Sequence, residues 1–312
     1  MRAFIFPGQG SQAVGMGVAL ADASRAARDV FEQVDEALGQ NLFRLMRDGP
    51  DEELKLTENA QSAIMANSMA VFAALTREGG VELEKAAQFV AGHSLGEYSA
   101  LCAAGSFDLA TTAKLLKLRG QAMQRAVPVG LGAMAALLGA DLALAQKIAD
   151  AAAQGDVCTV ANDNDPSQVV ISGHKAAIDR AIEMAKEMGA KRAVPLPVSA
   201  PFHCSLMQPA AEAMRDALSY VVLERPVVPV FANVTAQPET DPDTIRNQLV
   251  EQVTGMVRWR ESVANMFDAG VHEFVEVGGR VLGPMVKRIA PDAQVTSVVS
   301  IEDVEALAKE IA

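Results

Sequence analysis

The stretch "FVAGHSLGEYSAL", from Phe89 to Leu101, decides how this chain is expected to fold. Its first three residues are apolar and predict a short buried strand, and residues 95–104 are compatible with a helix. Between them lies the pattern Gly-x-Ser-x-Gly. This pattern predicts a sharp strand-to-helix turn that exposes Ser94 as a nucleophile at its apex. The alternative is an ordinary serine in a strand–helix turn.

Strands and helices alternate on both sides of this stretch. Short apolar runs bounded by turn residues predict buried strands, and longer runs with a period near 3.6 predict helices. This alternation is typical of a mostly parallel sheet covered by helices on both faces. The expected strands are 3–6, 89–91, 228–234 and 272–278, and the expected helices are 17–48, 58–78, 95–104, 110–124, 242–253 and a closing helix.

The middle of the chain has a different rhythm, β-α-β-β-α-β, which predicts a ferredoxin-like subdomain over 128–197. The expected fold class is therefore α/β, with a large α/β-hydrolase-like domain formed by 1–127 and 198–312 and a small ferredoxin-like subdomain inserted into it. The strands expected in the subdomain are 133–140, 157–163, 168–173 and 192–198, with helices over 141–154 and 174–189.

Composition narrows the class of protein. The chain has 312 residues, half of them apolar, and a formal charge of −12, which argues against nucleic acid as the main partner. The three cysteines, Cys102, Cys158 and Cys204, lack the spacing of a metal site, so we expect no metal ion and no cofactor. No signal-peptide pattern and no apolar run of about 18 residues occurs, so we expect a cytoplasmic protein without membrane contact. We also expect a monomer.

A serine nucleophile needs a base, and the chain has four histidines. His203 lies in "LPVSAPFHCSLM", where three prolines within 195–201 predict an irregular loop, and it is the best candidate. His93 adjoins Ser94, so its side chain is expected to point elsewhere. His174 is expected to be a solvated residue near the start of a helix, and His272 is expected to be structural. For each of these residues a structural role is the alternative.

Arg119 lies on the apolar face of the helix expected over 110–124, beside Leu115, Leu116 and Met123. Burying a guanidinium is costly unless an anion meets it. Two interpretations remain open. Either Arg119 pairs with a buried Asp or Glu, or it holds a substrate carboxylate through two parallel hydrogen bonds.

Gly8-x-Gly10-x-x-Ala13 follows the first expected strand and matches the dinucleotide fingerprint. The acidic residues at a suitable distance, Asp22 and Asp29, lie in a helix-like run instead of ending a second strand. The alternative is a glycine-rich active-site loop.

Taken together, these motifs resemble those of the malonyl-CoA:acyl-carrier-protein transacylase family, which is related to the acyltransferase domains of polyketide synthases. The resemblance covers essentially the whole chain, in family order and spacing. It rests on "FPGQGSQ" (6–12), "GHSLGEYSAL" (92–101), "LRGQAM" (118–123), "VANDN" (160–164) with "QVVISG" (168–173), "PFHCSLM" (201–207) and "NQLVEQVTGMVRW" (247–259).

The resemblance implies a reaction and a set of roles. Ser94 would take a malonyl group from malonyl-CoA and pass it to the phosphopantetheine thiol of acyl carrier protein, supplying extender units for fatty-acid synthesis. His203 would be the base, oriented by the backbone carbonyl of Gln252. The other implied roles are the oxyanion hole for the N–H groups of Gln9 and Leu95, and substrate binding for Arg119, Met123, Phe202 and Asn162.

Selectivity and one rival function complete the expectations. Leu95 after the serine and Phe202 before the histidine resemble malonyl-selective members. The rival is a serine esterase or thioesterase of the α/β-hydrolase type, in which the late His272 would be the base.

Overall fold

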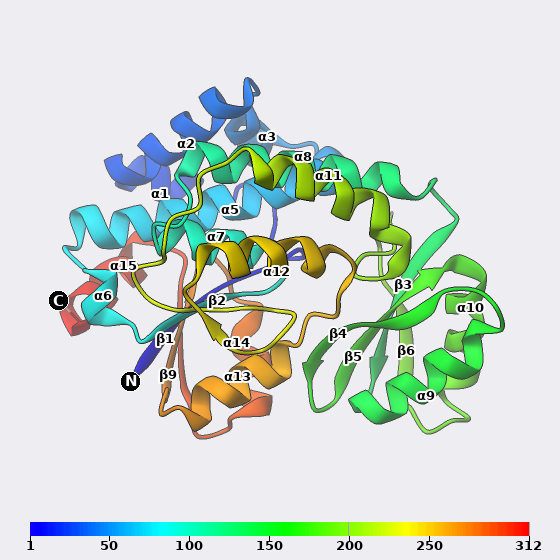
Figure 1. Ribbon diagram of the computed structural model, residues 1–312. Coiled ribbons are helices and arrows are strands. Elements are labelled where there is room, and N and C mark those ends of the chain that lie inside the picture. Colours follow the sequence, from blue (N-terminus) through cyan, green and yellow to red (C-terminus); the bar gives the residue numbers. More distant parts are fainter. Residues whose placement is uncertain (199, 312) are drawn as a thin grey trace.

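A computed structural model describes residues 1–198 and 200–311, and within them the strands form a six-stranded sheet and a four-stranded sheet (Figure 1). Ser199 and Ala312 belong to the second segment expected for the large domain, and they lie outside the described residues. The fold is mixed α/β, and the larger sheet is predominantly parallel.

The larger sheet has the order β10-β9-β1-β2-β7-β8, in which only the short β8 runs antiparallel to its neighbour. Because parallel neighbours end at the same edge, the loop after β1 and the turn after β2 lie side by side there. The strands are β1 (Arg2–Phe6), β2 (Phe89–Gly92), β7 (Val230–Phe231), β8 (Pro238–Glu239), β9 (Glu273–Val277) and β10 (Gln294–Val298).

Both faces of this sheet are buried, since alternate side chains of a strand point to opposite faces. On one face Phe4 and Phe6 join a large core, and on the other Ala3 and Ile5 pack with α13 and α14. The helices around the larger sheet are α1 (Val18–Ala23), α2 (Arg25–Leu38), α3 (Leu42–Asp48), α4 (Asp51–Leu54), α5 (Thr57–Ala73), α6 (Leu83–Ala86), α7 (Gly96–Ala103), α8 (Leu109–Ala126), α11 (Gln208–Ser219), α12 (Pro242–Thr254), α13 (Trp259–Asp268), α14 (Leu282–Ile289) and α15 (Ile301–Ile311).

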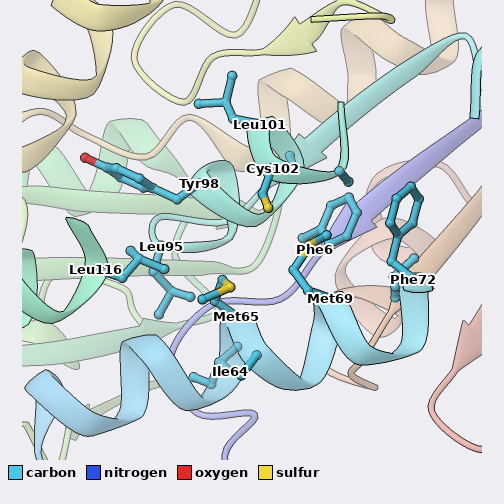
Figure 2. Close-up of a cluster of buried hydrophobic side chains, with 14 of the residues drawn as sticks. Phe6, Ile64, Met65, Met69, Phe72, Leu95, Tyr98, Leu101, Cys102 and Leu116 are labelled. Atoms are coloured by element: carbon cyan, nitrogen blue, oxygen red, sulfur yellow. The ribbon is translucent and has the colours of Figure 1, made fainter. Parts of the chain in front are cut away.

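The core lies directly behind the strand–turn–helix unit at residues 89–103. Figure 2 shows Leu95, Met65 and Leu116 together in this cluster. Tyr98, on helix α7, belongs to the same cluster. Helix α5 is buried almost all round, and a π-helical turn, Ala74–Glu78, continues it. Burial of this apolar surface stabilises the base from which the turn projects.

The smaller sheet is antiparallel and has the order β4-β5-β3-β6 (Figure 1). Two helices pack on it and bury a separate apolar cluster. Its elements follow one another as β3 (Gly132–Leu138), α9 (Leu142–Ala153), β4 (Cys158–Asp165), β5 (Gln168–His174), α10 (Lys175–Ala185) and β6 (Arg192–Pro195), and a 3₁₀ turn, Ser205–Met207, precedes α11.

Strand β4 ties the two sheets together. The N–H of Val257, in the segment before α13, donates to Ala161 O at 2.9 Å, and the N–H of Asp163 donates to Val257 O at 2.9 Å. The carboxylate of Asp163 also pairs with Arg260 of α13. These contacts hold the β4 residues of the smaller sheet against the carboxyl edge of the larger one.

Three expected elements differ clearly from the structure. The strand expected over 228–234 is only the two residues of β7. The helix expected over 17–48 is three helices, because Ser24 caps α2 and Gly39 ends it in the left-handed conformation. The closing helix is two helices, α14 and α15, with the edge strand β10 between them. The exposure pattern of β10 is mixed, and this explains why its alternation is weak in the sequence.

Candidate active site

The turn over residues 92–96, called here the Ser94 turn, requires both of its glycines. A Cβ on Gly92 would lie 1.9 Å from the backbone of Gly96, and a Cβ on Gly96 would lie 2.3 Å from Phe6 O. Ser94 itself has a φ of 54°, which side-chain-bearing residues rarely adopt. The spacing of the motif therefore reflects close backbone approach at the carboxyl edge of the sheet.

Ser94 and His203 are in direct contact. Ser94 Oγ lies 2.8 Å from His203 Nε2, although 109 residues separate the two in sequence. His203 lies between β6 and α11 and also has a positive φ, 57°. Its Nδ1 faces two backbone carbonyls, Gln252 O at 2.9 Å and Gly255 O at 3.1 Å. Because both are acceptors, Nδ1 carries the proton, and Nε2 is free to accept the serine proton.

The surroundings keep His203 neutral. Burial lowers the pKa of its imidazole to about 3, and the positive charge of Arg119 acts in the same direction. The hydrogen bond from Nδ1 to Gln252 O acts in the opposite direction but is the weaker effect. A neutral imidazole in contact with a hydroxyl can act as a general base at neutral pH.

Arg119 of α8 is 1% exposed and approaches the same hydroxyl. Its guanidinium donates to Gln61 Oε1 at 2.7 Å, to Gln252 Oε1 at 2.8 Å and to Ser94 Oγ at 3.1 Å. Among the described residues, no carboxylate lies within ion-pair distance of it, and its Nε has no hydrogen-bond partner. Burial lowers the pKa of Arg119 from its usual value. Of the two interpretations of Arg119, a paired structural cation does not match this arrangement.

A cavity of about 230 Å³ opens over these groups, between the two sheets. Gln9 reaches it from the loop after β1, and Asn162 reaches it from β4 of the smaller sheet. The expected site residues are thus brought together, with the side chain of Gln252 just behind Ser94. Those that line the cavity are Gln9, Ser94, Leu95, Arg119, Met123, Asn162, Phe202 and His203.

Two residues that line the cavity have a backbone N–H without a hydrogen-bond partner among the described residues. The amide N–H groups of Gln9 and Leu95 find no acceptor in the part of the chain that the structure describes. The side chain of Leu95 packs into the core behind the turn, as Figure 2 shows, while its backbone borders the cavity. The side chain of Leu95 therefore belongs to the core, although the residue also lines the cavity.

The other histidines have distinct surroundings. His93 does not contact the Ser94 hydroxyl, as expected: its Nε2 lies 2.8 Å from Asn164 Oδ1, although the residue also lines the cavity. His174 Nδ1 accepts from the N–H of Val157. His272 directly precedes β9, at the end of the sheet opposite Ser94, and its ring packs edge-on against Phe267.

The described residues contain neither a cluster of metal ligands nor a membrane-spanning helix. The residues that the structure describes include no group of three or more His, Cys, Asp or Glu side chains suited to a metal ion. Among the same residues, no helix is both long and apolar enough to cross a membrane. The three cysteines are buried, and burial raises the pKa of each thiol.

Sequence reasoning missed three residues of the site. Gln61 on α5 holds the Arg119 guanidinium, and Glu97 and Asn233 lie beside the Ser94 turn. Glu97 is buried, and burial raises the pKa of its carboxyl to about 7. The available signal for Glu97 was a charge in the otherwise uncharged helix α7, whereas Gln61 lies among several polar residues of α5 and carried no such signal. Asn233 carried no such signal, since it follows a short strand.

Comparison with known proteins gives a consistent result. The acyl transferase domain family matches residues 3–283. The malonyl CoA-acyl carrier protein transacylase of Escherichia coli K12 is 46% identical over 288 residues, which are 92% of each chain. A crystal structure of the acyl-carrier-protein-S-malonyltransferase of Bartonella henselae has a TM-score of 0.97 and 50% identity, and covers 99% of both chains.

One further solved structure is a malonyl-transacylase in complex with its type II PKS acyl-carrier protein. It has a TM-score of 0.95 and 39% identity, again with 99% of each chain covered. The agreement extends over the length of the chain and includes both sheets. The protein therefore belongs to the malonyl-CoA:acyl-carrier-protein transacylase family of acyl transferases.

Proposed function

We propose that this protein transfers a malonyl group from malonyl-CoA to the phosphopantetheine thiol of an acyl carrier protein, through an ester on Ser94. One observation carries the proposal beyond family membership. Arg119 is buried at the cavity without a carboxylate partner among the described residues, and it donates to the Oγ of Ser94. A dicarboxylic acyl thioester offers a carboxylate to this cation and a carbonyl to the serine.

In this reaction Ser94 is the nucleophile and His203 the base. As Oγ attacks the thioester carbonyl, Nε2 takes the hydroxyl proton and later returns it to the sulfur of the leaving coenzyme A. The backbone carbonyl of Gln252 accepts from Nδ1–H and holds the ring in the required tautomer. The carrier-protein thiol then attacks the ester by the same steps, which gives ping-pong kinetics.

The oxyanion formed in each step is bound by the N–H groups of Gln9 and Leu95. The Leu95 amide lies at the start of α7, where the helix dipole adds positive potential. Each such donor contributes about 3 kcal/mol to the transition state. The absence of another acceptor for either donor, within the described residues, supports this role.

Substrate recognition is assigned to the other side of the cavity. Arg119 binds the malonyl carboxylate, and the side chains of Met123 and Phe202 bound the space for the rest of the acyl group. Asn162 reaches the cavity from the smaller sheet and offers an amide to polar atoms of the substrate. The bulk of Phe202 supports a preference for an unbranched α-carbon.

The contact of Ser94 with His203 also bears on the rival esterase. An α/β-hydrolase order would require His272 as the base, and His272 lies at the amino end of β9. The carboxyl edge that holds Ser94 is the opposite edge. The observed geometry therefore favours the transacylase.

We also propose how the fold divides. The large domain is formed by 1–127 and 198–312 and has an α/β-hydrolase-like arrangement, with the nucleophile after a central strand. The residues 128–197 form the inserted ferredoxin-like subdomain. Their β-α-β-β-α-β order and the antiparallel order β4-β5-β3-β6 support this assignment.

The carrier protein is the proposed second substrate, on the strength of the relative solved in complex with one. Fatty-acid synthesis is the proposed pathway. The monomeric state and the cytoplasmic location stay predictions.

A mass-shift experiment tests the proposed function. The protein is incubated with malonyl-CoA without carrier protein, and intact mass is measured. We expect an adduct of one malonyl group, lost in the Ser94→Ala variant and removed from the wild type by added holo acyl carrier protein. No adduct on the wild type, or an adduct that persists in Ser94→Ala, would contradict the proposal.

A further inference from the structure

The side chain of Asn233 makes hydrogen bonds to two backbone groups of the Ser94 turn, one at Ser94 and one at Gly92. Its Oδ1 accepts from the backbone N–H of Ser94 at 2.7 Å, and its Nδ2 donates to Gly92 O at 2.7 Å. Asn233 is 1% exposed and comes from the segment after β7, 139 residues from Ser94. One amide side chain thus fixes two backbone groups of the turn.

Glu97 holds Asn233 in place. One carboxylate oxygen of Glu97 accepts from the backbone N–H of Asn233 at 3.0 Å and from Gln252 Nε2 at 2.8 Å. The same Nε2 lies 3.0 Å from the backbone carbonyl of Ser94. The N–H and the C=O of Ser94 are therefore bound by the side chains of Asn233 and Gln252. Glu97 accepts from both residues, from the backbone N–H of Asn233 and from the side-chain amide of Gln252.

The turn depends on such contacts because its backbone is strained. A residue with a side chain and a φ of 54° costs about 1–3 kcal/mol, and it persists only where its surroundings determine it. Helix α7 begins at Gly96, so no helical carbonyl satisfies the Ser94 N–H. Without Asn233 this N–H would lose its only hydrogen-bond acceptor among the described residues.

The hydrogen bond from Ser94 N–H to Asn233 also distinguishes the two neighbouring amides of the turn. Since Asn233 occupies the N–H of Ser94, the N–H of Leu95 is the amide of the turn that lacks an acceptor among the described residues. A small rotation of the turn would move this donor and Ser94 Oγ together. Misplacement of reacting groups by about 1 Å can cost about 10²-fold in rate.

We propose that Asn233, held by Glu97, is a positioning residue for the transfer reaction. It fixes the Ser94 turn so that Oγ stays at 2.8 Å from His203 and the Leu95 amide faces the oxyanion. Asn233 is not among the residues that line the cavity. This inference rests on the proposed function only in taking Ser94 as the nucleophile.

The test compares Asn233→Ala with a matched control, Asn265→Ala. Asn265 Nδ2 donates to Ala236 O at 2.8 Å, so the control also removes one bond from an Asn side chain to this loop, away from Ser94. Single-turnover malonylation by malonyl-CoA is followed by intact mass. We expect the rate to fall about 10²-fold in Asn233→Ala and to stay within about 3-fold of wild type in Asn265→Ala.

Binding is measured separately, by calorimetry with malonyl-CoA on Ser94→Ala and on Ser94→Ala/Asn233→Ala. A positioning role leaves the dissociation constant within about 3-fold while the acylation rate falls. Parallel losses of binding and rate would show general damage and overturn the proposal. So would a folded Asn233→Ala protein that is acylated at the wild-type rate.

A milder variant covers the case in which Asn233→Ala does not fold. Glu97→Gln keeps the size of the side chain and an oxygen for the Asn233 N–H but removes the charge. Because charge-assisted hydrogen bonds are roughly twice as strong as neutral ones, we expect a loss of about 3-fold to 10-fold. A Glu97→Gln protein with the wild-type acylation rate and pH dependence would overturn the proposal.

A second acyl donor separates this proposal from the proposed function. The burst of p-nitrophenolate from p-nitrophenyl acetate reports acylation of Ser94 without a malonyl group. If malonyl-CoA leaves the wild type unmodified, the proposed function fails, and the burst still compares wild type with Asn233→Ala. Equal burst rates would then overturn the positioning role.

Discussion

The two sides of the cavity differ in how completely their polar atoms are partnered. On the reaction side, Ser94 N–H, Ser94 O and both nitrogens of His203 have partners within 3.1 Å. On the recognition side, Arg119 is buried with its Nε unpartnered among the described residues. The nucleophile and the base are therefore already fixed by hydrogen bonds, and the amides of Gln9 and Leu95 are left for the oxyanion. Arg119, in contrast, has no carboxylate partner among the described residues.

This difference reflects what each side must do. Groups that stabilise a transition state work best when they are already fixed, because no free energy of reorganisation is then needed. A buried cation that lacks a counter-ion gains most from a substrate carboxylate, since burial strengthens their attraction. Arg119 also donates to Ser94 Oγ, so carboxylate binding and the nucleophile are adjacent.

Removing the base should have the largest effect and would break the reaction side. His203→Ala leaves Ser94 Oγ without a proton acceptor, so we expect the acylation rate to fall about 10³-fold. Stopped-flow or single-turnover mass measurement at pH 7.5 gives the rate. His272→Ala is the matched control and should keep the wild-type rate. Loss of activity in the control alone would mean that the base has been misassigned.

Removing Arg119 should weaken recognition of the malonyl carboxylate and leave acylation by an uncharged acyl group largely unchanged. Arg119→Ala removes charge-assisted hydrogen bonds to the substrate carboxylate, worth about 1.5–3 kcal/mol. We expect kcat/KM for malonyl-CoA to fall about 10²-fold, with a much smaller change for acetyl-CoA.

The control for this prediction is Arg125→Ala, which removes an exposed arginine from the same helix. Its kcat/KM for both thioesters should match wild type. If Arg119→Ala lowers kcat/KM equally for malonyl-CoA and acetyl-CoA, Arg119 contributes to the acylation step and not to recognition of the carboxylate.

Burial of a neutral His203 should also be visible in stability. Its pKa is about 3 in the folded protein and near 6.5 in the unfolded chain, so below pH 6.5 the unfolded state binds the extra proton. The free energy of unfolding therefore decreases as the pH falls. Relative to His203→Gln, wild type should lose about 1 kcal/mol between pH 6.5 and pH 5.5. Urea unfolding at the two pH values measures this, and equal losses would contradict the neutral state.

The smallest expected effect is on the pH dependence of acylation, and it involves the carboxylate of Glu97. His203 stays neutral between pH 5 and pH 8, so any acid limb of acylation in that range belongs to another group. Burial raises the pKa of Glu97 to about 7, and its carboxylate accepts from Asn233 and Gln252 and interacts electrostatically with Arg119 and Tyr98. As the pH falls below 7, Glu97 gains a proton and holds Asn233 and Gln252 less strongly.

We therefore expect the acylation rate of wild type to fall a few-fold, about 3-fold to 10-fold, from pH 8 to pH 5.5. Glu97→Gln should have a flat profile at the lower level. The measurement is single-turnover acylation across this range in one ionic strength. If Glu97→Gln shows the same decrease in acylation rate at low pH as the wild type, the titrating group is not Glu97.

Much of the architecture was predictable because its signals are local. The alternation of buried strands and helices is confirmed for the larger sheet, which is predominantly parallel. The Ser94 turn is predictable from two glycines, since only residues without a Cβ fit there. The strand β10 and the breaks within 17–48 were not predicted, because a half-exposed edge strand and short capped helices leave weak periodicity.

The site was predictable in its types of residue and not in its contacts. Arg119 was identifiable because a charge on an apolar helix face conflicts with the local pattern. His203 was identifiable only as one of four histidines, with a loop of prolines to favour it. Its role, like those of Gln252, Gln9 and Leu95, came from the resemblance to a family.

By itself, the sequence determined the α/β alternation, the strained turn at Ser94 and a buried cation in need of an anion. These follow from side-chain period, backbone sterics and the cost of burying charge, all of which act along neighbouring residues. Only the tertiary structure decided that Ser94 meets His203, and that Asn233, Gln252 and Glu97 hold the turn. Those contacts join residues separated by up to 158 positions, and the side chains that become neighbours depend on how the two sheets pack.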